Sequence, residues 1–422
     1  MALTAMRFTR QFAVLLLPAL WLGMRPAAAG TPRAFRLLSE SNTEAVGLSP
    51  SGTLTWSNQA AAGRFQVEQN VNLSTGQWFS FISGPATATW HSLKLWDFNA
   101  PTGMVYIPSG DFVRGEHMPI DFSGWADERA MPLSTVWVSA VYVDQVEITK
   151  TRWDDVRNWA LTNGFTDLSA GRGGTDLLPQ TNDMGGITNY LAVEAGPDHP
   201  VVQISWYDAV KWCNARSLRE GLTPAYFTNS AFTALYQTGQ VDLATNMVNW
   251  TCTGYRLPTE AEWEKAARGG LISQHYPWPS SGTDLAVTVN GTMANYANSS
   301  DAFEPGTTPS GYYDGSQWVT NGAGDPLPVT SMSNFYGVMD VAGNVSEWCW
   351  DWYLFQYEWQ ITNNFLHDPI GPPQQANYYR IIRGGDWTGP IDWMRCAYRD
   401  VAYPFRQRDY LGFRAVRRPV AP

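Results

Sequence analysis

The segment from Asp386 to Arg395 gathers the side chains of this chain that are best suited to holding a ligand. It carries carboxylates at Asp386 and Asp392, indole rings at Trp387 and Trp393, and a guanidinium group at Arg395. Indole faces stack on sugar rings, and a guanidinium group pairs with a carboxylate or a sulfate. These residue types predict a pocket for a peptide or a glycan.

Two alternatives compete with this interpretation. Asp386 and Asp392 could act as an acid–base pair, but we rank this below a structural role because the sequence gives no distance between them. The arginines Arg395, Arg399 and Arg414 could form internal ion pairs, and we favour that role for Arg399 and Arg414.

A second group of candidate ligands is the loop Asp340-Val-Ala-Gly-Asn-Val-Ser-Glu347. Calcium binds about six to eight oxygens, and many of them are backbone carbonyls of irregular loops. The loop supplies carboxylate and carbonyl oxygens, and it therefore predicts a structural calcium site. The alternative is that Asp340 and Glu347 only cap the loop.

Helix-start signals indicate the elements that position these segments. Thr259 and Glu262 form a capping box, so a helix is expected to run from there to Arg268, where Gly269 ends it. Ser205 is the expected N-cap of another helix.

Two further elements, a strand and a helix, are expected upstream of these helices. Val136 to Tyr142 alternates apolar and polar residues and predicts a strand, and Thr149 or Thr151 is the expected cap of a helix that reaches Leu161.

The N-terminal part of the chain has a different composition. Residues 1–29 combine basic residues, a short apolar run and a row of alanines, as in a secretory signal peptide. Residues 33–98 contain short alternating runs separated by Ser, Gly and Asn clusters, which predicts a small β-sandwich-like module that serves as a spacer or in adhesion. Residues 99–103 form the expected linker to a main domain over residues 104–418.

Composition limits the partners of the protein. The chain has 422 residues and a net charge of −10, with an isoelectric point near 5.0, so nucleic acids and anionic membrane surfaces are not expected as partners. After the signal peptide no apolar run has transmembrane length, which predicts a protein without a membrane anchor. The 21 tryptophans are expected mostly in the core of a loop-rich fold.

Five strings in the chain resemble the formylglycine-generating enzymes, also called sulfatase-modifying factors. They are Tyr-Arg-Leu-Pro-Thr-Glu-Ala-Glu-Trp-Glu (255–264), Gly-Asn-Val-Ser-Glu-Trp (343–348), Arg-Gly-Gly-Asp-Trp (383–387), Arg-Cys-Ala-Tyr-Arg (395–399) and Leu-Gly-Phe-Arg (411–414). The resemblance implies an α+β fold of the C-type-lectin-like kind, with little regular secondary structure, after the small all-β module.

The resemblance also implies a reaction that this chain lacks the residues to perform. The family oxidises a cysteine of a client protein with a pair of cysteines that follows the Arg-Gly-Gly string and holds Cu(I), a soft metal that prefers thiolates. Residues 386–394 contain no cysteine. We therefore expect neither bound copper nor formylglycine-generating activity, and no catalytic residue is assigned.

For calcium the resemblance implies two sets of ligands. The first lies in the loop described above and comprises Asp340, Gly343, Val345 and Glu347. The second comprises Asn295, Tyr296, Asp301 and Phe303, at a shorter spacing than in the family. Ordinary polar turns are the alternative for this second set.

The four cysteines are Cys213, Cys252, Cys349 and Cys396. An even number in an exported protein favours disulfides. The partners that the resemblance implies for Cys213 and Cys396 are alanines here, so the pairing has to differ from that of the family. We expect Cys349–Cys396 and Cys213–Cys252, with four buried free thiols as the alternative.

Two functions follow from the sequence. The first is an exported protein, periplasmic or secreted, that resembles sulfatase-modifying factors, binds a secreted peptide, protein or glycan, and holds calcium only as a structural ion. The second is a divergent oxidoreductase that modifies secreted sulfatases or other client proteins with a different set of residues. A structural or adhesive surface protein is a weaker third possibility, supported by the N-terminal module.

Overall fold

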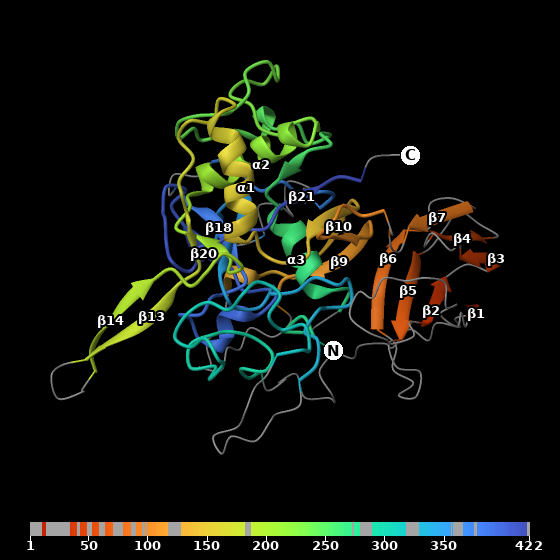
Figure 1. The fold of residues 1–422 in the computed structure, drawn as a ribbon. Coiled ribbons are helices and arrows are strands. Elements are labelled where there is room, and N and C mark those ends of the chain that lie inside the picture. The colour runs from red at the N-terminus through yellow and green to blue at the C-terminus, as the bar shows by residue number, and fades with distance from the viewer. Residues whose placement is uncertain are drawn as a thin grey trace.

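A computed structural model describes most of the chain. It covers strands before residue 95 and then residues 97, 99–116, 128–181, 187–271, 274–278, 289–317, 329–355, 357, 366–374 and 378–419. Within these residues the fold is a mixed α/β structure with few helices and many short strands (Figure 1).

Three α-helices occur in the described residues, and each starts at a side-chain cap. They are α1 (Lys150–Leu161), α2 (Trp206–Arg219) and α3 (Glu260–Arg268), and their N-caps are Thr149, Ser205 and Thr259. Both α2 and α3 begin with a capping box, and Gly269 ends α3 with φ of 57°. These helix predictions are confirmed. None of the helices described is long and apolar enough to cross a membrane.

Two four-stranded sheets form the centre of the main domain. The first has the order β16-β21-β11-β8, and the second has the order β19-β18-β17-β20. Their bounds are β8 Met104–Ile107, β11 Val141–Asp144, β16 Tyr255–Arg256, β17 Ser346–Trp352, β18 Arg380–Arg383, β19 Asp400–Ala402, β20 Leu411–Gly412 and β21 Val416–Arg417. The strand β17 is buried at every residue and pairs parallel to β20 and antiparallel to β18.

The N-terminal strands continue into the main domain. A six-stranded sheet with the order β1-β2-β5-β6-β9-β10 crosses the predicted linker, because β6 pairs with β9 through Ser83 and Asp111. The strands are β1 Gln11–Ala13, β2 Ala34–Ser39, β5 Arg64–Asn70, β6 Phe79–Pro85, β9 Gly110–Arg114 and β10 Ser134–Val138. An ion pair between Arg64 and Asp111 adds to this contact. The segment predicted as a separate module thus shares a sheet with the rest of the chain.

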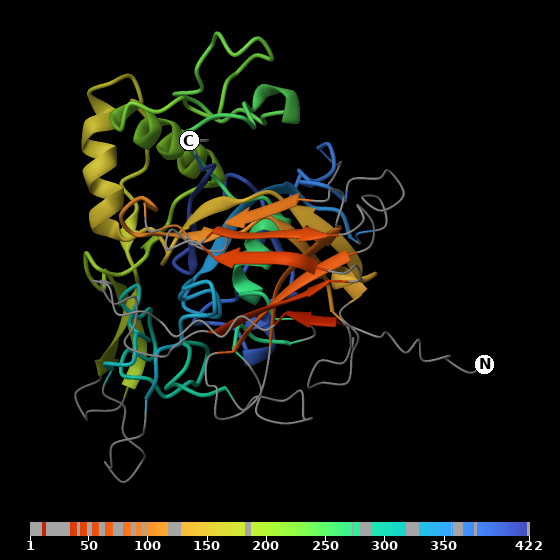
Figure 2. The same cartoon turned by 90° about the vertical axis from the view of Figure 1, so that its right-hand side faces the viewer.

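A three-stranded sheet completes the N-terminal part. Its order is β3-β4-β7, with the bounds β3 Thr43–Leu48, β4 Thr53–Asn58 and β7 Trp90–Lys94. Figure 2 shows these N-terminal strands in red and orange across the front of the molecule. Of the predicted signal peptide, only the three residues of β1 are described, and residues 1–10 and 14–29 lie outside the described residues.

Two further strand pairs occur in the main domain, and the first of them contacts α1. They are β12 (Arg172–Gly173) with β15 (Val201–Val202), and β13 (Asp176–Thr181) with β14 (Ile187–Val193). The β13–β14 hairpin projects from the body of the molecule (Figure 1).

Tryptophan side chains fill the core, as the sequence predicts. Those with less than 2% exposure are Trp56, Trp153, Trp206, Trp212, Trp263, Trp348 and Trp350. The rings of Trp153 on α1 and Trp212 on α2 are parallel, with centroids 5.8 Å apart, and Phe413 packs edge-on against both. This aromatic contact fixes the two helices against the C-terminal segment.

Candidate functional site

The predicted ligand segment follows β18, and hydrogen bonds to the buried carboxylate of Asp386 fix its first turn. One carboxylate oxygen of this buried residue accepts from the Ser346 hydroxyl at 2.8 Å, and the other accepts from the Thr388 amide and hydroxyl at 3.0 and 2.6 Å. Burial raises the pKa of the Asp386 carboxyl above its usual value. Asp386 therefore fixes the turn at residues 386–388.

The other predicted pocket residues divide by exposure. Trp387 is buried and donates from its indole nitrogen to the Asp409 carbonyl at 3.3 Å. Arg395 is also buried and pairs with Glu116 at 3.2 Å. Asp392 and Trp393 are half-buried, and the Trp393 ring is stacked on Tyr398 with centroids 5.9 Å apart. Only Asp392 and Trp393 thus keep surface that a ligand can reach.

Internal ion pairs engage Arg399 and Arg414, as predicted. Arg399 donates to both carboxylate oxygens of Glu260, and Arg383 donates to Glu260 at 3.3 Å and to Glu264 at 2.7 Å. All these side chains are at most 2% exposed. The carboxylates on α3 thereby bind β18 and the segment after the ligand loop, and this network positions the whole region.

The first predicted calcium set contains one residue that does not fit a metal. Glu347 accepts from Arg414 Nε and Nη2, both at 2.7 Å, and from the indole nitrogen of Trp263 at 2.8 Å. This carboxylate is committed to a buried ion pair, which the sequence motif alone did not indicate. Calcium at Asp340, Gly343 and Val345 stays a prediction.

The second predicted set lies against the first. The Asn295 carbonyl accepts from the Asn344 amide at 2.8 Å, and it lies so close to Gly343 that a Cβ atom there would come within 2.2 Å of it. Asp301 is capped locally, because its carboxylate accepts from the Ser299 hydroxyl at 2.8 Å and the Phe303 amide at 2.7 Å. The Tyr296 carbonyl accepts from the Ser299 amide at 3.0 Å. In the described residues, no group of three or more His, Cys, Asp or Glu side chains could hold a metal ion.

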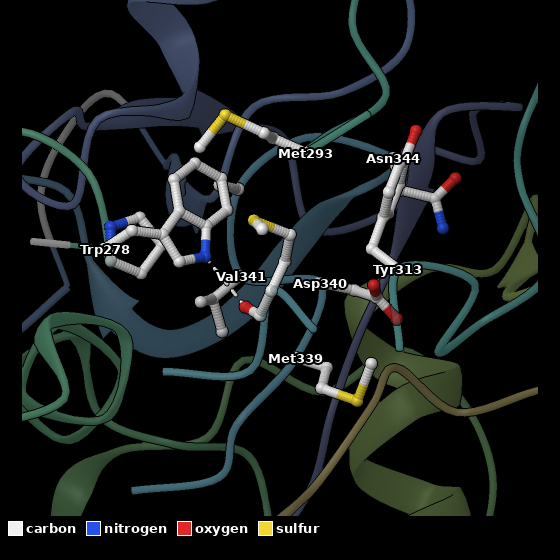
Figure 3. A pocket seen from close by; sticks show the side chains of 10 residues that line it. Trp278, Met293, Tyr313, Met339, Asp340, Val341 and Asn344 are labelled. Atoms are coloured by element: carbon white, nitrogen blue, oxygen red, sulfur yellow. Dashed lines mark hydrogen bonds between the residues drawn. The ribbon is translucent and has the colours of Figure 1, made fainter. Parts of the chain in front are cut away.

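A small cavity lies beside the 340–344 loop (Figure 3). Its volume is about 10 Å³, which is room for one water molecule. Trp278 lies at one end and Asp340, Tyr313 and Asn344 at the other, with methionine side chains between them. It is too small for a peptide or a sugar.

The four cysteines are buried free thiols, so neither expected disulfide is formed. Cys213 and Cys252 share one core cluster, and Cys349 and Cys396 share another. The two members of each expected pair therefore lie in the same core cluster, but their sulfur atoms are not bonded. Burial raises the pKa of the Cys396 thiol to about 12, so it is not a thiolate at neutral pH.

Thiol titration tests this state directly. We expect no reaction of the native protein with a thiol reagent within minutes, because all four sulfur atoms are shielded from solvent. In denaturant without reductant, four thiols per chain should react. A count of two or zero in protein isolated from an oxidising compartment would contradict the free-thiol state.

An aromatic surface that the sequence analysis missed lies next to the buried region. Tyr379, Tyr403 and Phe405 form a row of ring contacts, the aromatic stack. The Tyr379 ring is tilted by 38° against Tyr403 with centroids 4.3 Å apart, and the Tyr403 and Phe405 rings are stacked with centroids 5.3 Å apart. Phe405 ends the stack with 52% of its surface exposed, and the Arg406 guanidinium lies 5.8 Å from both the Tyr403 and Phe405 rings. The string Tyr403-Pro-Phe405 was a signal that could have indicated this surface.

Arg380, the residue after Tyr379, is buried against indole rings. The Arg380 guanidinium lies 3.4 Å from the Trp352 ring centroid and 3.8 Å from that of Trp206. Burial lowers the pKa of Arg380 to about 9. In the described part of the chain, its Nε and Nη2 atoms have no hydrogen-bond partner.

Comparison with known proteins supports the relationship that the sequence suggested. The family model for the sulfatase-modifying factor enzyme 1-like domain matches residues 97–419. The formylglycine-generating enzyme of Thermomonospora curvata is 29% identical over 75% of this chain and 94% of its own. The chaperone protein LppX of Paenibacillus barcinonensis is 31% identical over 48% of this chain and 64% of its own.

A third relative shows that the same domain occurs in longer proteins. The serine/threonine-protein kinase Pkn1 of Chlamydia trachomatis is 35% identical over 75% of this chain but only 38% of its own length. The chain thus spans less than two thirds of both the kinase and LppX. Since the family model covers most of the chain, the protein belongs to the sulfatase-modifying factor family.

Proposed function

We propose that this protein is an exported member of the sulfatase-modifying factor family that binds a ligand and has lost copper-dependent cysteine oxidation. The observation that carries the proposal is the construction of the loop at residues 386–394. It contains no cysteine, and the carboxylate of Asp386 is fully used to hold the turn. We also propose that the main domain is of the C-type-lectin-like kind, in line with its short strands and few helices.

Copper does not fit the residues present. Cu(I) prefers a pair of thiolates that can approach each other. Cys396, the nearest cysteine to the loop, is fully buried and keeps its proton at neutral pH because burial raises its pKa to about 12. Its sulfur therefore provides neither the charge nor the access that a copper site needs.

The exposed aromatic stack supports ligand binding. Phe405 offers an open ring face, and Arg406 supplies a positive charge beside it. A pyranose ring can stack on such a face, while an acidic group of the ligand pairs with the guanidinium. Trp393 and Asp392, both half-buried, are further candidates for contact. This surface favours a glycan over a peptide, because a flat ring face suits a sugar ring.

The first measurement is elemental analysis of the protein purified without chelator, before and after copper loading. We expect calcium and no stoichiometric copper or iron. The protein is then screened against glycan and peptide arrays, with glycans as the expected ligands. Copper or iron near one per chain would instead favour the alternative function, a divergent oxidoreductase that modifies secreted client proteins.

A matched pair of variants tests the binding surface. Phe405→Ala should weaken glycan binding by about five- to hundredfold, if a sugar ring gains from stacking what a nucleic-acid base gains, which is about 1–3 kcal/mol. Phe232→Ala is the control, because Phe232 is 40% exposed but lies outside the stack. Equal affinities of the two variants, measured by titration calorimetry, would exclude the stack as the binding surface.

A further inference from the structure

We propose that the hairpin of β13 and β14 is a dimerisation arm, and that its partner is the same hairpin of a second copy of this chain. The two β14 strands pair antiparallel across a twofold axis, so that the two hairpins form one four-stranded sheet. The arm is defined as Asp176–Thr181 and Ile187–Val193, without the turn between them. This inference rests neither on the proposed ligand nor on a bound metal.

The arm exposes apolar side chains on a segment that projects from the body of the molecule (Figure 1). Leu178, Tyr190 and Leu191 are 44%, 46% and 53% exposed, and they make up three of the seven strongly exposed large apolar side chains in the described residues. Leu178 lies opposite Leu191 in the ladder, so both side chains share one face. A two-stranded hairpin by itself is marginally stable in water, whereas three or more strands with an apolar face form a stable sheet. Further strands would therefore stabilise the arm.

The outer edge of β13 is closed to a further strand. At its base, Asp176 forms a bridge with Gly306, and the Leu177 amide donates to the Pro305 carbonyl at 3.3 Å. Two residues farther along, Pro179 has no amide hydrogen to donate. Proline on an exposed strand is a common means by which proteins block edge-to-edge pairing. Any added strand must therefore pair with β14.

The outer edge of β14 turns backbone groups away from β13. Because the Leu177 amide donates away from β14, Leu177 and Ala192 form a non-hydrogen-bonded pair of the ladder. The next such pair is Pro179 with Tyr190, so the Tyr190 amide and carbonyl also point outward. Arg172 donates to the Ala192 carbonyl at 2.7 Å, which limits the outer edge to the part of β14 before Ala192. Among the described residues β13 is the only strand beside β14, so a further strand can pair along this edge.

Charge favours a second copy of the chain as the partner. The net charge is −10, so two copies repel each other overall, but β14 carries no charged residue. A β14 strand that pairs antiparallel with its copy therefore places no like charges opposite one another. A strongly basic or acidic partner, in contrast, would find no counter-charge along this edge. In a twofold dimer each copy offers the same edge, and the closed edge of β13 ends the sheet after two copies.

Sedimentation velocity of the full chain tests the proposal over a range from submicromolar to submillimolar concentration. We expect a reversible equilibrium between one and two chains, because a pair of strands of 7 residues each is smaller than the interfaces of permanent dimers. The mass should rise with concentration and stop at two chains. A mass of one chain at every concentration would overturn the proposal. Growth beyond two chains would also overturn it, since the closed edge of β13 forbids such growth.

Two variants in β14 identify the surface. Leu191→Asp brings two like charges together across the β14 pair, and Tyr190→Pro removes an outward-pointing amide without breaking the ladder to β13. Each should raise the dissociation constant of the dimer by at least about tenfold, because each change occurs twice in a twofold dimer. Phe232→Asp is the control, since Phe232 is 40% exposed but lies outside the arm, and this variant should dimerise like the wild type.

Unchanged dimerisation in both arm variants would show that another surface joins the two copies, and it would overturn the proposal. Loss of the dimer in Leu191→Asp but not in Tyr190→Pro would indicate packing of side chains without pairing of the β14 strands, and it would overturn the proposal as well. The melting temperature at a concentration where only single chains are present separates loss of the contact from loss of folding. If Leu191→Asp fails to fold, Tyr190→Pro still decides the question.

Discussion

Replacing Glu260 by Gln is expected to lower the free energy of unfolding by about 3–5 kcal/mol. The Glu260 carboxylate is 1% exposed and receives hydrogen bonds from Arg399 and Arg383, which are themselves at most 2% exposed. Removing one charge from a buried ion pair leaves the partner guanidinium groups without compensation in a region of low dielectric constant. Because whole domains are stable by only about 5–15 kcal/mol, this single change should remove much of the stability.

Urea unfolding monitored by tryptophan fluorescence gives the free energy. A matched exposed pair serves as the control: Asp155 pairs with Arg219, and their side chains are 61% and 34% exposed. Asp155→Asn should cost less than about 1 kcal/mol, since water screens such pairs. If Glu260→Gln costs no more than Asp155→Asn, the buried network does not stabilise the fold in the way we describe.

Replacing Lys265 by Met should remove a steep dependence of stability on alkaline pH. Lys265 on α3 is 1% exposed and donates to the Gly110 carbonyl at 2.8 Å and the Val138 carbonyl at 3.2 Å. Burial lowers the pKa of its ammonium group from 10.5 to about 7. Between these two values the unfolded chain binds more protons than the native protein, so native stability rises with pH in this window.

The size of this effect follows from the two pKa values. A separation from 10.5 to about 7 corresponds to about 5 kcal/mol, on the order of 1.4 kcal/mol for each pH unit. Below pH 7 the native ammonium is also charged, and the full cost is present. The measurement is the difference in unfolding free energy between wild type and Lys265→Met from pH 6 to pH 10. Parallel curves would contradict the lowered pKa, whatever the offset between them.

Local signals in the sequence predicted local structure well. The capping box at Thr259 and Glu262 determines where α3 begins, because both partners lie within one turn of each other. The internal roles of Arg399 and Arg414 were also predictable, since guanidinium groups in an apolar, loop-rich chain need carboxylate partners. In both cases the residue types alone were enough to predict the feature, a helix start or an internal ion pair.

Properties that depend on distant contacts were not predictable. Asp386 and Trp387 point inward because they bond to Ser346 and Asp409. These partners lie 40 residues before Asp386 and 22 residues after Trp387. The contact between the Glu147 and Asp340 carboxyl groups joins residues 193 positions apart, and no local pattern indicates it. Cys349 and Cys396 lie in the same core cluster, but they do not form a disulfide.

The position of β21 affects the order in which the chain can fold. This strand lies between β16 and β11 in its sheet, although it is the last of the strands in sequence. The sheet therefore cannot close until residues 416–417 have been synthesised, and folding of the domain during translation must wait for nearly the whole chain. Until then the unfinished chain exposes apolar surface and unpaired strand edges, which makes it prone to aggregation and dependent on chaperones.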